Sequence, residues 1–356
     1  MDRIAEETER RIAQAYALRR QAAADAVAGR IASLHAAHPA LADIDRAIAV
    51  AGSELVLESL GPVPDRSSGA QDRLHGLAAQ KEVLLRGLGI DPSYDRPARV
   101  CGDCADTGTL SGGEPCPCRG ALRTRLLTEA SGLGSLASCT FDVQDKNLFD
   151  DRVNENRDKA DVSPRVQWNG VRIACRTFAA ETGDGDAGVR DLLLVGSPGT
   201  GKTFMAASIA NEVIARGRSV RYLPAPAMFD ILGNYRTLCS SFRPDEERFE
   251  DAERDRAVIL ESRLLVVDDL GTESVPPHTA LPELLNILDR RHGDSLRTVF
   301  CTNVDLKTLQ RHYDERLWSR IIGRCTVLRF IGDDLRLRAL RMRRPAPTRG
   351  GADPVA

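Results

Sequence analysis

A glycine-rich segment at residues 196–203 has the composition of a phosphate-binding loop. It reads Gly-Ser-Pro-Gly-Thr-Gly-Lys-Thr and fits the pattern G-x-x-x-x-G-K-[ST] completely. In such a loop the backbone N–H groups surround phosphate, the lysine reaches the β- and γ-phosphates, and the last hydroxyl binds Mg²⁺. The apolar run at 191–195 predicts a strand before the loop, and the helix-forming run after 203 predicts a helix whose N-terminus points at phosphate. The alternative is a glycine-rich turn that contains a lysine by chance. The predicted nucleotide-binding residues are Gly196, Ser197, Pro198, Gly199, Thr200, Gly201, Lys202 and Thr203.

Two acids and an amide follow two further apolar strands. Asp268 and Asp269 come directly after Leu-Leu-Val-Val, and Asn303 follows the run at 297–302. The carboxyl ends of parallel strands share the edge where an open α/β sheet binds ligands. We therefore predict that Asp268 and Thr203 hold Mg²⁺ and that Asp269 polarises the attacking water as a general base. Asn303 could orient the same water, although a strand-terminal asparagine more often makes a turn.

Two arginines near the C-terminus are candidates for stabilising phosphate charge. Arg320 lies in Glu-Arg-Leu-Trp-Ser-Arg, and Arg336 follows Gly-Asp-Asp at 332–334. Arginine can deliver charge to a γ-phosphate within one subunit or from a neighbouring one. Solvation of a helix surface is the alternative for both side chains.

Four cysteines form two tight pairs, Cys101-x-x-Cys104 and Cys116-x-Cys118. Four thiolates satisfy tetrahedral Zn²⁺ and close a site of the structural kind. A segment this short lacks a core of its own, so a bound metal would contribute much of its folding free energy. Free thiols, a redox pair and an iron–sulfur cluster are the alternatives, and zinc fits the spacing best.

The composition is that of an ordinary soluble protein, with 28% charged and 42% hydrophobic residues and a net charge of −2. We expect neither a signal peptide nor a membrane span, because no apolar stretch is long enough for either. Nine cysteines, an odd number, favour reduced thiols and a cytoplasmic location over a disulfide framework. The region 311–344 is locally basic, with ten arginines and four acids.

Hydrophobic periodicity predicts an α-helical N-terminal region followed by an α/β domain. We expect two or three helices over 1–60, broken near Pro39, another over 70–88, a loop over 150–169 and a helix over 171–181. Strands are expected at 190–195, 219–223, 263–268, 297–302 and 326–330. Their alternation with helices predicts a parallel sheet with helices on both faces, the P-loop NTPase class. The predicted segments are a helical partner-binding domain (1–95), a zinc-binding segment (96–125), a connector (126–185), an ATPase domain (186–344) and a disordered tail (345–356). For 1–95, a helical bundle packed only on itself is the alternative to partner binding.

The order of these motifs resembles the AAA+ ATPases of the DnaC/DnaI type, the bacterial replicative-helicase loaders. The resemblance spans roughly residues 100–344, and Thr140-Phe141-Asp142 resembles the lead-in to the family's ATPase core. It implies that Asn303 is sensor 1, that Arg320 is an arginine finger acting on a neighbouring subunit, and that Arg336 is sensor 2 acting in cis. Asp269 departs from the general AAA+ pattern, which has glutamate there, and so we expect slow hydrolysis.

The resemblance further implies an ATP-dependent assembly factor. Such a protein would bind the replicative helicase through its N-terminal zinc-containing part, and it would bind ATP, Mg²⁺, single-stranded DNA and copies of itself through the AAA+ part. Arg236 and Arg243 are candidates for DNA contact. One alternative is a transposition helper ATPase of the IstB type, a group without a four-cysteine segment. Another is a binding module that holds nucleotide and hardly hydrolyses it.

Overall fold

The computed structural model of the chain describes residues 2–59, 67–143, 145–182, 188–242, 245–273 and 280–343. They divide into two units, one formed by Met1–Arg11 with Gly120–Ala356 and the other by Ile12–Arg119. The predicted tail 345–356 and the DNA-contact candidate Arg243 lie outside the described residues. The proposed division into five segments therefore stays a prediction.

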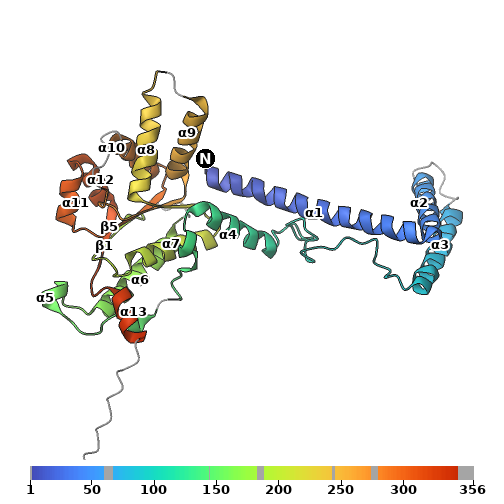
Figure 1. Cartoon of the computed structure of the whole chain (residues 1–356), viewed down its shortest axis with the longest axis horizontal. Helices are drawn as coiled ribbons and strands as arrows, with labels where there is room; N and C mark the ends of the chain where they lie inside the picture. The colour runs from blue at the N-terminus through green and yellow to red at the C-terminus, as the bar shows by residue number, and fades with distance from the viewer. Residues whose placement is uncertain are drawn as a thin grey trace, which may run out of the picture. The chain divides into compact units, whose positions relative to one another are not determined.

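A five-stranded parallel sheet is the centre of the first unit (Figure 1). Its strands are β1 (Asp191–Gly196), β2 (Val220–Pro224), β3 (Leu264–Asp268), β4 (Arg297–Thr302) and β5 (Cys325–Phe330), each within two residues of its predicted bounds. The order is β2-β3-β4-β1-β5, and every pairing is parallel. The chain is thus an α/β P-loop fold, as predicted, and β4 lies between the strands that carry the glycine loop and the acid pair.

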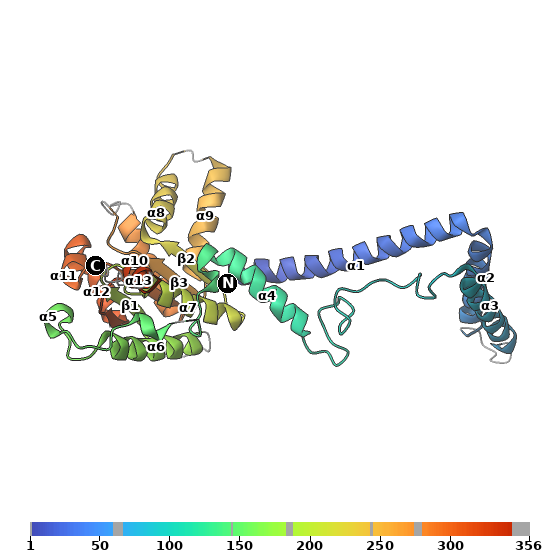
Figure 2. The ribbon, with the colours of Figure 1, turned by 60° about the horizontal axis from the view of Figure 1, so that its bottom comes forward.

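Helices cover both faces of this sheet, because neighbouring residues of a strand point to opposite sides. Leu192 and Leu194 pack with α6 (Pro164–Glu181) and α7 (Lys202–Ala215). Leu193 and Val195 pack on the other face, under the remaining helices. Figure 2 shows the two layers, with the α8–α9 hairpin on the side away from α6. The second layer consists of α8 (Ala225–Cys239), α9 (Glu246–Glu261), α10 (Ala280–Gly293), α11 (Leu306–His312) and α12 (Glu315–Arg324).

Helix α6 begins at Pro164, seven residues before the predicted start at Val171. The Ser163 hydroxyl caps it by accepting from the Val166 N–H at 3.3 Å, and proline is well suited to a first helical turn because its missing N–H would have no partner there. Buried Trp168 stacks on Phe149 with ring centroids 4.6 Å apart. The expectation of a loop through Asn169 was wrong because it took Pro164 as a helix breaker instead of a helix start. Four-residue α5 (Glu155–Asp158) precedes it, and α4 (Pro117–Ser131) and α13 (Leu335–Arg343) complete the unit.

The second unit is helical, as expected. It contains most of α1 (Arg3–Ala37), α2 (Pro39–Ser59) and α3 (Ser67–Leu88), and Pro39 begins α2. Leu41, Leu85 and Tyr94 form a small core. Beside it the Asp45 carboxylate accepts from the Lys81 ammonium at 2.9 Å and pairs with His35 at 2.7 Å. Within the described part of the chain, no helix is both long and apolar enough to cross a membrane.

Candidate functional site

The glycine loop joins the end of β1 to the start of α7. Gly199 and Gly201 have φ angles of 76° and 97°, in the left-handed region that favours glycine. The Thr200 hydroxyl donates to the Ser197 carbonyl at 2.8 Å and fixes the loop from inside. The loop therefore has the strand–loop–helix geometry that the sequence predicted, with Lys202 as the first residue of α7.

Lys202 is buried inside its own loop. Its ammonium donates to the carbonyls of Gly196 and Ser197, each at 2.8 Å, and the residue is only 5% exposed. Burial is the main cause of its lowered pKa, and the positive charge of Arg336 contributes in the same direction. A charged phosphate oxygen is a stronger acceptor than these neutral carbonyls, so the ammonium has a reason to turn toward a phosphate.

The two acids lie at the carboxyl end of β3 in different environments. Asp268 is 7% exposed, and its carboxylate accepts from the Tyr222 hydroxyl at 2.6 Å and from the Asp269 N–H at 3.0 Å. Asp269 has a φ of 56°, which is uncommon for a residue with a side chain. That backbone conformation lets its carboxylate accept from the Asn303 amide at 2.6 Å. The structure thus brings the predicted acid pair and Asn303 together across neighbouring strands.

The pKa of Asp269 is raised by burial and by the adjacent charge of Asp268, while the Asn303 amide opposes the rise. A carboxylate with a raised pKa takes up a proton more readily, which is what general-base chemistry requires. Asp268 is more buried than Asp269, and its carboxylate is fixed by two hydrogen-bond donors, the Tyr222 hydroxyl and the Asp269 N–H. A carboxylate fixed in this way suits cation binding. The two carboxylates therefore differ in burial and in hydrogen-bond partners, and their roles stay predictions.

Helix α13 contacts the glycine loop directly. The Leu335 N–H donates to the Gly199 carbonyl at 2.9 Å. A Cβ atom at Gly199 would lie 2.1 Å from the Asp334 carboxyl carbon, so no other residue fits there without displacing Asp334. Arg336 is the second residue of α13, exposed and near enough for its charge to act on Asp269 and Lys202. The predicted cis arginine is therefore next to the loop.

Arg320 is not part of this group. Its guanidinium pairs with Asp289 of α10 at 3.0 Å, and its side chain is half exposed. Arg324, one turn later on α12, shares the same carboxylate at 2.7 Å. The geometry of one chain thus leaves Arg320 at the surface and away from the chain's own glycine loop.

Sequence reasoning missed Tyr222, whose hydroxyl holds Asp268. Its position at the end of a predicted strand, on the ligand-binding edge of the sheet, was the available signal. A hydroxyl-bearing aromatic residue in an apolar strand is easily mistaken for a core residue, and Tyr222 is indeed buried.

The four predicted cysteine ligands come together in the second unit. Their sulfur atoms all lie within 4.8 Å of one another. Cys101 and Cys116 sulfurs are 3.8 Å apart, and those of Cys104 and Cys118 are 3.5 Å apart. A tetrahedron of Zn–S bonds of about 2.3 Å has S···S edges of about 3.8 Å, so the sulfur positions fit a closed zinc site.

The loops around these cysteines are built to hold them. The buried Asp106 carboxylate accepts from the Val100 N–H at 2.9 Å and from the Cys101 N–H at 3.0 Å. The Gly108 carbonyl accepts from the Cys116 N–H at 3.0 Å. The Tyr16 hydroxyl of α1 lies 3.0 Å from the Cys118 sulfur. Backbone donors and a neighbouring helix thus position the thiols, as outer partners do in metal sites.

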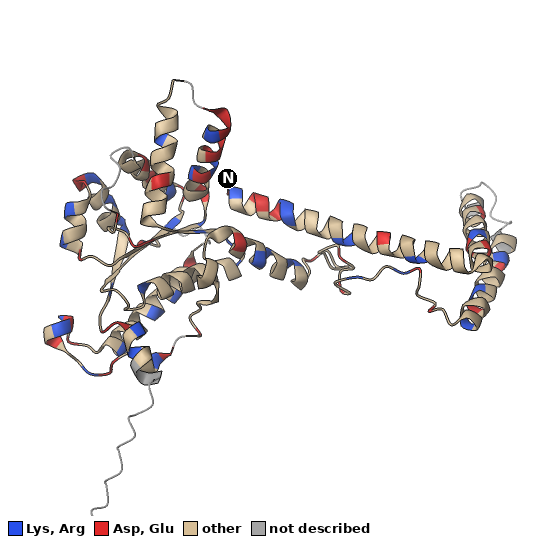
Figure 3. Cartoon of the chain, viewed as in Figure 1, with Lys and Arg blue, Asp and Glu red and all other residues tan. Residues whose placement is uncertain are grey.

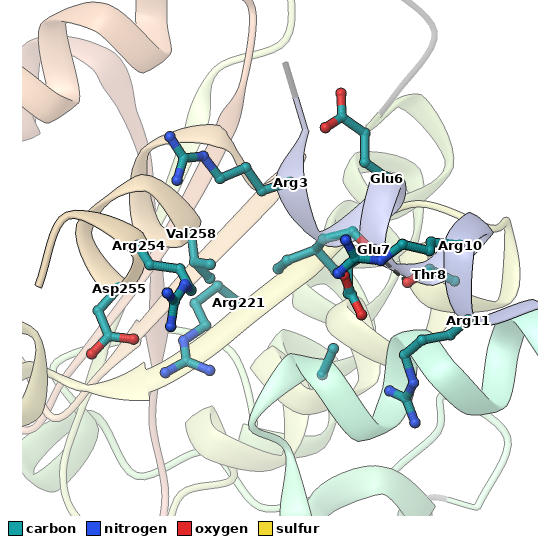
Figure 4. Close-up of a pocket in the computed structure, with 12 residues that line it drawn as sticks. Arg3, Glu6, Glu7, Thr8, Arg10, Arg11, Arg221, Arg254, Asp255 and Val258 are labelled. Carbon is teal, nitrogen blue, oxygen red and sulfur yellow. Dashed lines mark hydrogen bonds and ion pairs between the residues drawn. The ribbon is translucent and has the colours of Figure 1, made fainter. Parts of the chain in front are cut away.

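A separate hollow of about 780 Å³ lies beside β2, away from the glycine loop (Figure 4). The first turns of α1, the α9 residues Arg254 and Asp255, and Arg221 of β2 line it. Arginines and acids both line it, and Arg10 pairs with Glu7. No residue of the predicted nucleotide site lines this hollow.

Comparison with known proteins gives a consistent family. Residues 187–342 match the sequence model of the family described as IstB-like ATP binding protein. The replicative helicase loader DnaC of Escherichia coli K12 is 26% identical over 158 residues, which cover 44% of this chain and 60% of that protein. The replicative helicase loader DnaI of Bacillus subtilis 168 is 27% identical over 168 residues, which cover 44% of this chain and 49% of that protein. The chain thus spans about half of these relatives' length.

A solved structure titled "Crystal Structure of the DnaI" matches 56% of this chain and 92% of that chain, with 22% identity and a TM-score of 0.40. The sequence matches confirm the resemblance to DnaC/DnaI-type ATPases that the motifs predicted, and the family model places its match at residues 187–342, within the α/β unit.

Proposed function

We propose that this chain, whose residues 187–342 form an IstB-like ATP-binding domain, is an ATP-dependent loader of a replicative DNA helicase. The observation that carries the proposal is the meeting of the glycine loop, the Asp268–Asp269 pair and Asn303 at one edge of the sheet. A separate helical unit with a four-cysteine site offers a second binding function. The names of the DnaC and DnaI relatives support helicase loading.

In this proposal the residues at the sheet edge bind ATP and hydrolyse it. The backbone N–H groups of 196–203 and the Lys202 ammonium hold the phosphates, and Thr203 and Asp268 would hold Mg²⁺. When bound, Mg²⁺ supplies positive charge beside the β- and γ-phosphates. Asp269 accepts a proton from the attacking water, and Asn303 orients the Asp269 carboxylate and that water.

The two arginines act from different chains. Arg336 stands beside the glycine loop of its own chain and stabilises charge there in cis. Arg320, half exposed on α12, reaches the ATP of a neighbouring copy, so hydrolysis depends on self-association. Asp269 is one methylene shorter than glutamate, which supports slow hydrolysis suited to a switch.

In this proposal the helical unit binds the helicase. Zinc on Cys101, Cys104, Cys116 and Cys118 would fix the fold of this unit and present its helices to the partner, since short knuckles depend on metal for their folding. The protein would act in the cytoplasm, where the replicative helicase works.

Single-stranded DNA would bind the basic C-terminal part of the α/β unit. The charge pattern supports this region over the α8–α9 hairpin, because α8, which carries Arg236, packs against α9, and α9 begins with several acids (Figure 3). Those acids are Glu246, Glu247, Glu250 and Asp251. Anisotropy with a labelled oligothymidine, measured from 50 to 200 mM salt, should show the steep salt dependence of phosphate contacts. A salt-independent signal would contradict the basic-surface proposal.

The test of the function is a pull-down of the full-length chain with the replicative helicase of the same organism. It is run without nucleotide, with ATP and with ADP. We expect capture in at least one state and release in another. Absence of binding in all three states would overturn helicase loading.

A second candidate function is transposition targeting, since the matched family is IstB-like. That role requires the chain to coat double-stranded DNA in ATP and to bind a transposase, and the four-cysteine unit has no part in it. Binding of duplex DNA in long ATP-dependent assemblies, with no capture of helicase, would favour this alternative.

A further inference from the structure

The turn that contains the acid pair is held by hydrogen bonds along its length. We call residues 268–273 the acid turn. The Leu270 N–H donates to the Cys301 carbonyl at 2.8 Å, and the Thr302 hydroxyl donates to the Leu270 carbonyl at 2.7 Å. Gly271 has a φ of 87°, and a Cβ there would lie 2.7 Å from the Leu309 side chain of α11. The acid turn is therefore packed between the end of β4 and α11.

A buried carboxylate and a buried phenol close this turn. The Gly271 N–H is shared between a Glu273 carboxylate oxygen and the Tyr313 hydroxyl oxygen, each at 3.1 Å. The Tyr313 hydroxyl in turn donates to the other oxygen of Glu273. Both residues are under 10% exposed. Burial, with the neighbouring Glu273 charge, raises the pKa of Tyr313, so its hydroxyl remains a donor at neutral pH.

Tyr313 stands directly before the helix that carries Arg320. The next residue, Asp314, caps α12 by accepting from the Leu317 N–H at 2.7 Å. From that cap, α12 runs as one helix through Arg320. The ring of Tyr313 packs on Phe229, with centroids 6.2 Å apart, and on His312 at 5.0 Å. The Tyr313 hydroxyl, through its contacts with the Glu273 carboxylate and the Gly271 N–H, thus joins the acid turn to the start of α12. The neighbouring His312 imidazole lies 3.6 Å from the same carboxylate.

We propose that Glu273 and Tyr313 are positioning residues that couple the two halves of the hydrolysis machinery. They hold Asp269 in place for the chain's own site, and they set the position of α12, which presents Arg320 to the neighbouring site. The inference rests on the proposed function, and it adds two residues to which neither the motif pattern nor the family match assigns a role. A displacement of about 1 Å in a reacting group can cost about 100-fold in rate, so a small shift at this contact is enough to matter.

The first test is Tyr313→Phe, which keeps the ring and removes only the hydroxyl. We expect kcat for ATP hydrolysis to fall at least tenfold while the Kd for a fluorescent ATP analogue stays within twofold. Glu273→Gln keeps one acceptor oxygen, which can accept from the Gly271 N–H, and its NH2 can donate to the Tyr313 hydroxyl oxygen, so this variant should retain most of the activity. Tyr235→Phe, on α8 and outside this contact, is the matched control and should leave kcat unchanged. A loss of affinity and of Tm without a separate loss of kcat would show a merely structural role and overturn the proposal.

The second test separates the two sites by mixing variants. Lys202→Ala removes a chain's own ATP site but leaves its Arg320, whereas Arg320→Ala does the reverse, so a mixture should recover activity at shared interfaces. We then add Tyr313→Phe to the Lys202→Ala chain. This chain has no ATP site of its own and contributes only its Arg320 to the site of a neighbouring chain. We expect recovery to fall at least threefold, because α12 is displaced in that chain.

The outcomes distinguish this proposal from the one on which it rests. Undiminished recovery with the doubly substituted chain would overturn the coupling and leave the proposed function intact. Absence of recovery in the simple mixture would overturn the trans role of Arg320, and the coupling with it. An unmodified full-length chain without ATP turnover would refute the ATPase itself.

Discussion

Replacing Asp269 by asparagine tests the proposed general base most directly. The substitution keeps the size of the side chain and the contact with Asn303, but it removes the charge that would accept a proton. General bases contribute about 10²–10⁴ in rate. At about 1.4 kcal/mol per factor of ten, this corresponds to about 3–5 kcal/mol of transition-state stabilisation. We expect kcat to fall by at least about 100-fold.

The structure also predicts what this substitution leaves unchanged. Lys202, the loop N–H groups and Asp268 remain, so the Kd for ATP should stay within about threefold. The folded pKa of Asp269 is raised, which means that its ionised form disfavours folding at neutral pH. Asp269→Asn should therefore have an equal or higher Tm at pH 7, and the difference should shrink as the pH falls and Asp269 in the unmodified chain becomes protonated.

The assay is steady-state phosphate release by the full-length chain with Mg²⁺, combined with analogue binding and thermal melting over pH 4–8. Asp255→Asn, an exposed acid on α9, is the matched control and should leave all three quantities unchanged. Turnover above about a third of that of the unmodified chain would refute Asp269 as the base. A lower Tm at pH 7 would refute the electrostatic reasoning.

Three further predictions concern the loop and the cysteines. Lys202→Ala should leave helicase capture intact in a pull-down but abolish its dependence on ATP; loss of capture would contradict the division of labour between the two units. Gly199→Ala should displace Asp334 and weaken ATP affinity at least tenfold in analogue titrations, because its Cβ would lie 2.1 Å from the Asp334 carboxyl carbon; unchanged affinity would show that α13 is not needed for binding. Removal of metal by a strong chelator should release about one zinc per chain and lower the helical circular-dichroism signal, and Cys104→Ser should do the same; a chain purified without zinc that melts normally would contradict the metal site.

The sequence predicts best those elements whose local residue pattern reflects their position in the fold. Each strand is a continuous apolar run, because a parallel strand covered on both faces is buried throughout. The glycine loop, Asp268 and Asn303 all follow such runs directly. Their meeting at one edge was therefore predictable once the sheet was taken as parallel.

The parts that were missed depend on contacts between distant residues. Tyr313 lies 40 residues after Glu273, and nothing in the sequence near either residue indicates that the two meet. Pro164 was ambiguous, since the same residue can end a helix or begin one, and the Ser163 cap decided between them. The proposed role of Arg320 is not visible in a single chain for a different reason. Its proposed target lies in a second copy of the chain, and within one chain Arg320 contacts Asp289.

The two charges at the centre of the site share one physical cause. Burial lowers the pKa of Lys202 and raises the pKa of Asp269, so each group resists its charged form. The charged form of Lys202 destabilises the fold until the pH rises through the pKa of Lys202 in the folded chain. The charged form of Asp269 destabilises the fold until the pH falls through the pKa of Asp269 in the folded chain. At neutral pH both charges therefore oppose folding. Lys202 donates to neutral carbonyls instead of pairing with a carboxylate. The charges of Asp268 and Asp269 favour the charged form of Lys202, but burial outweighs them and the pKa of Lys202 stays lowered. Binding of a nucleotide with its cation, which brings opposite charge to both, would offset that cost and so couple ATP binding to the stability of the whole α/β unit.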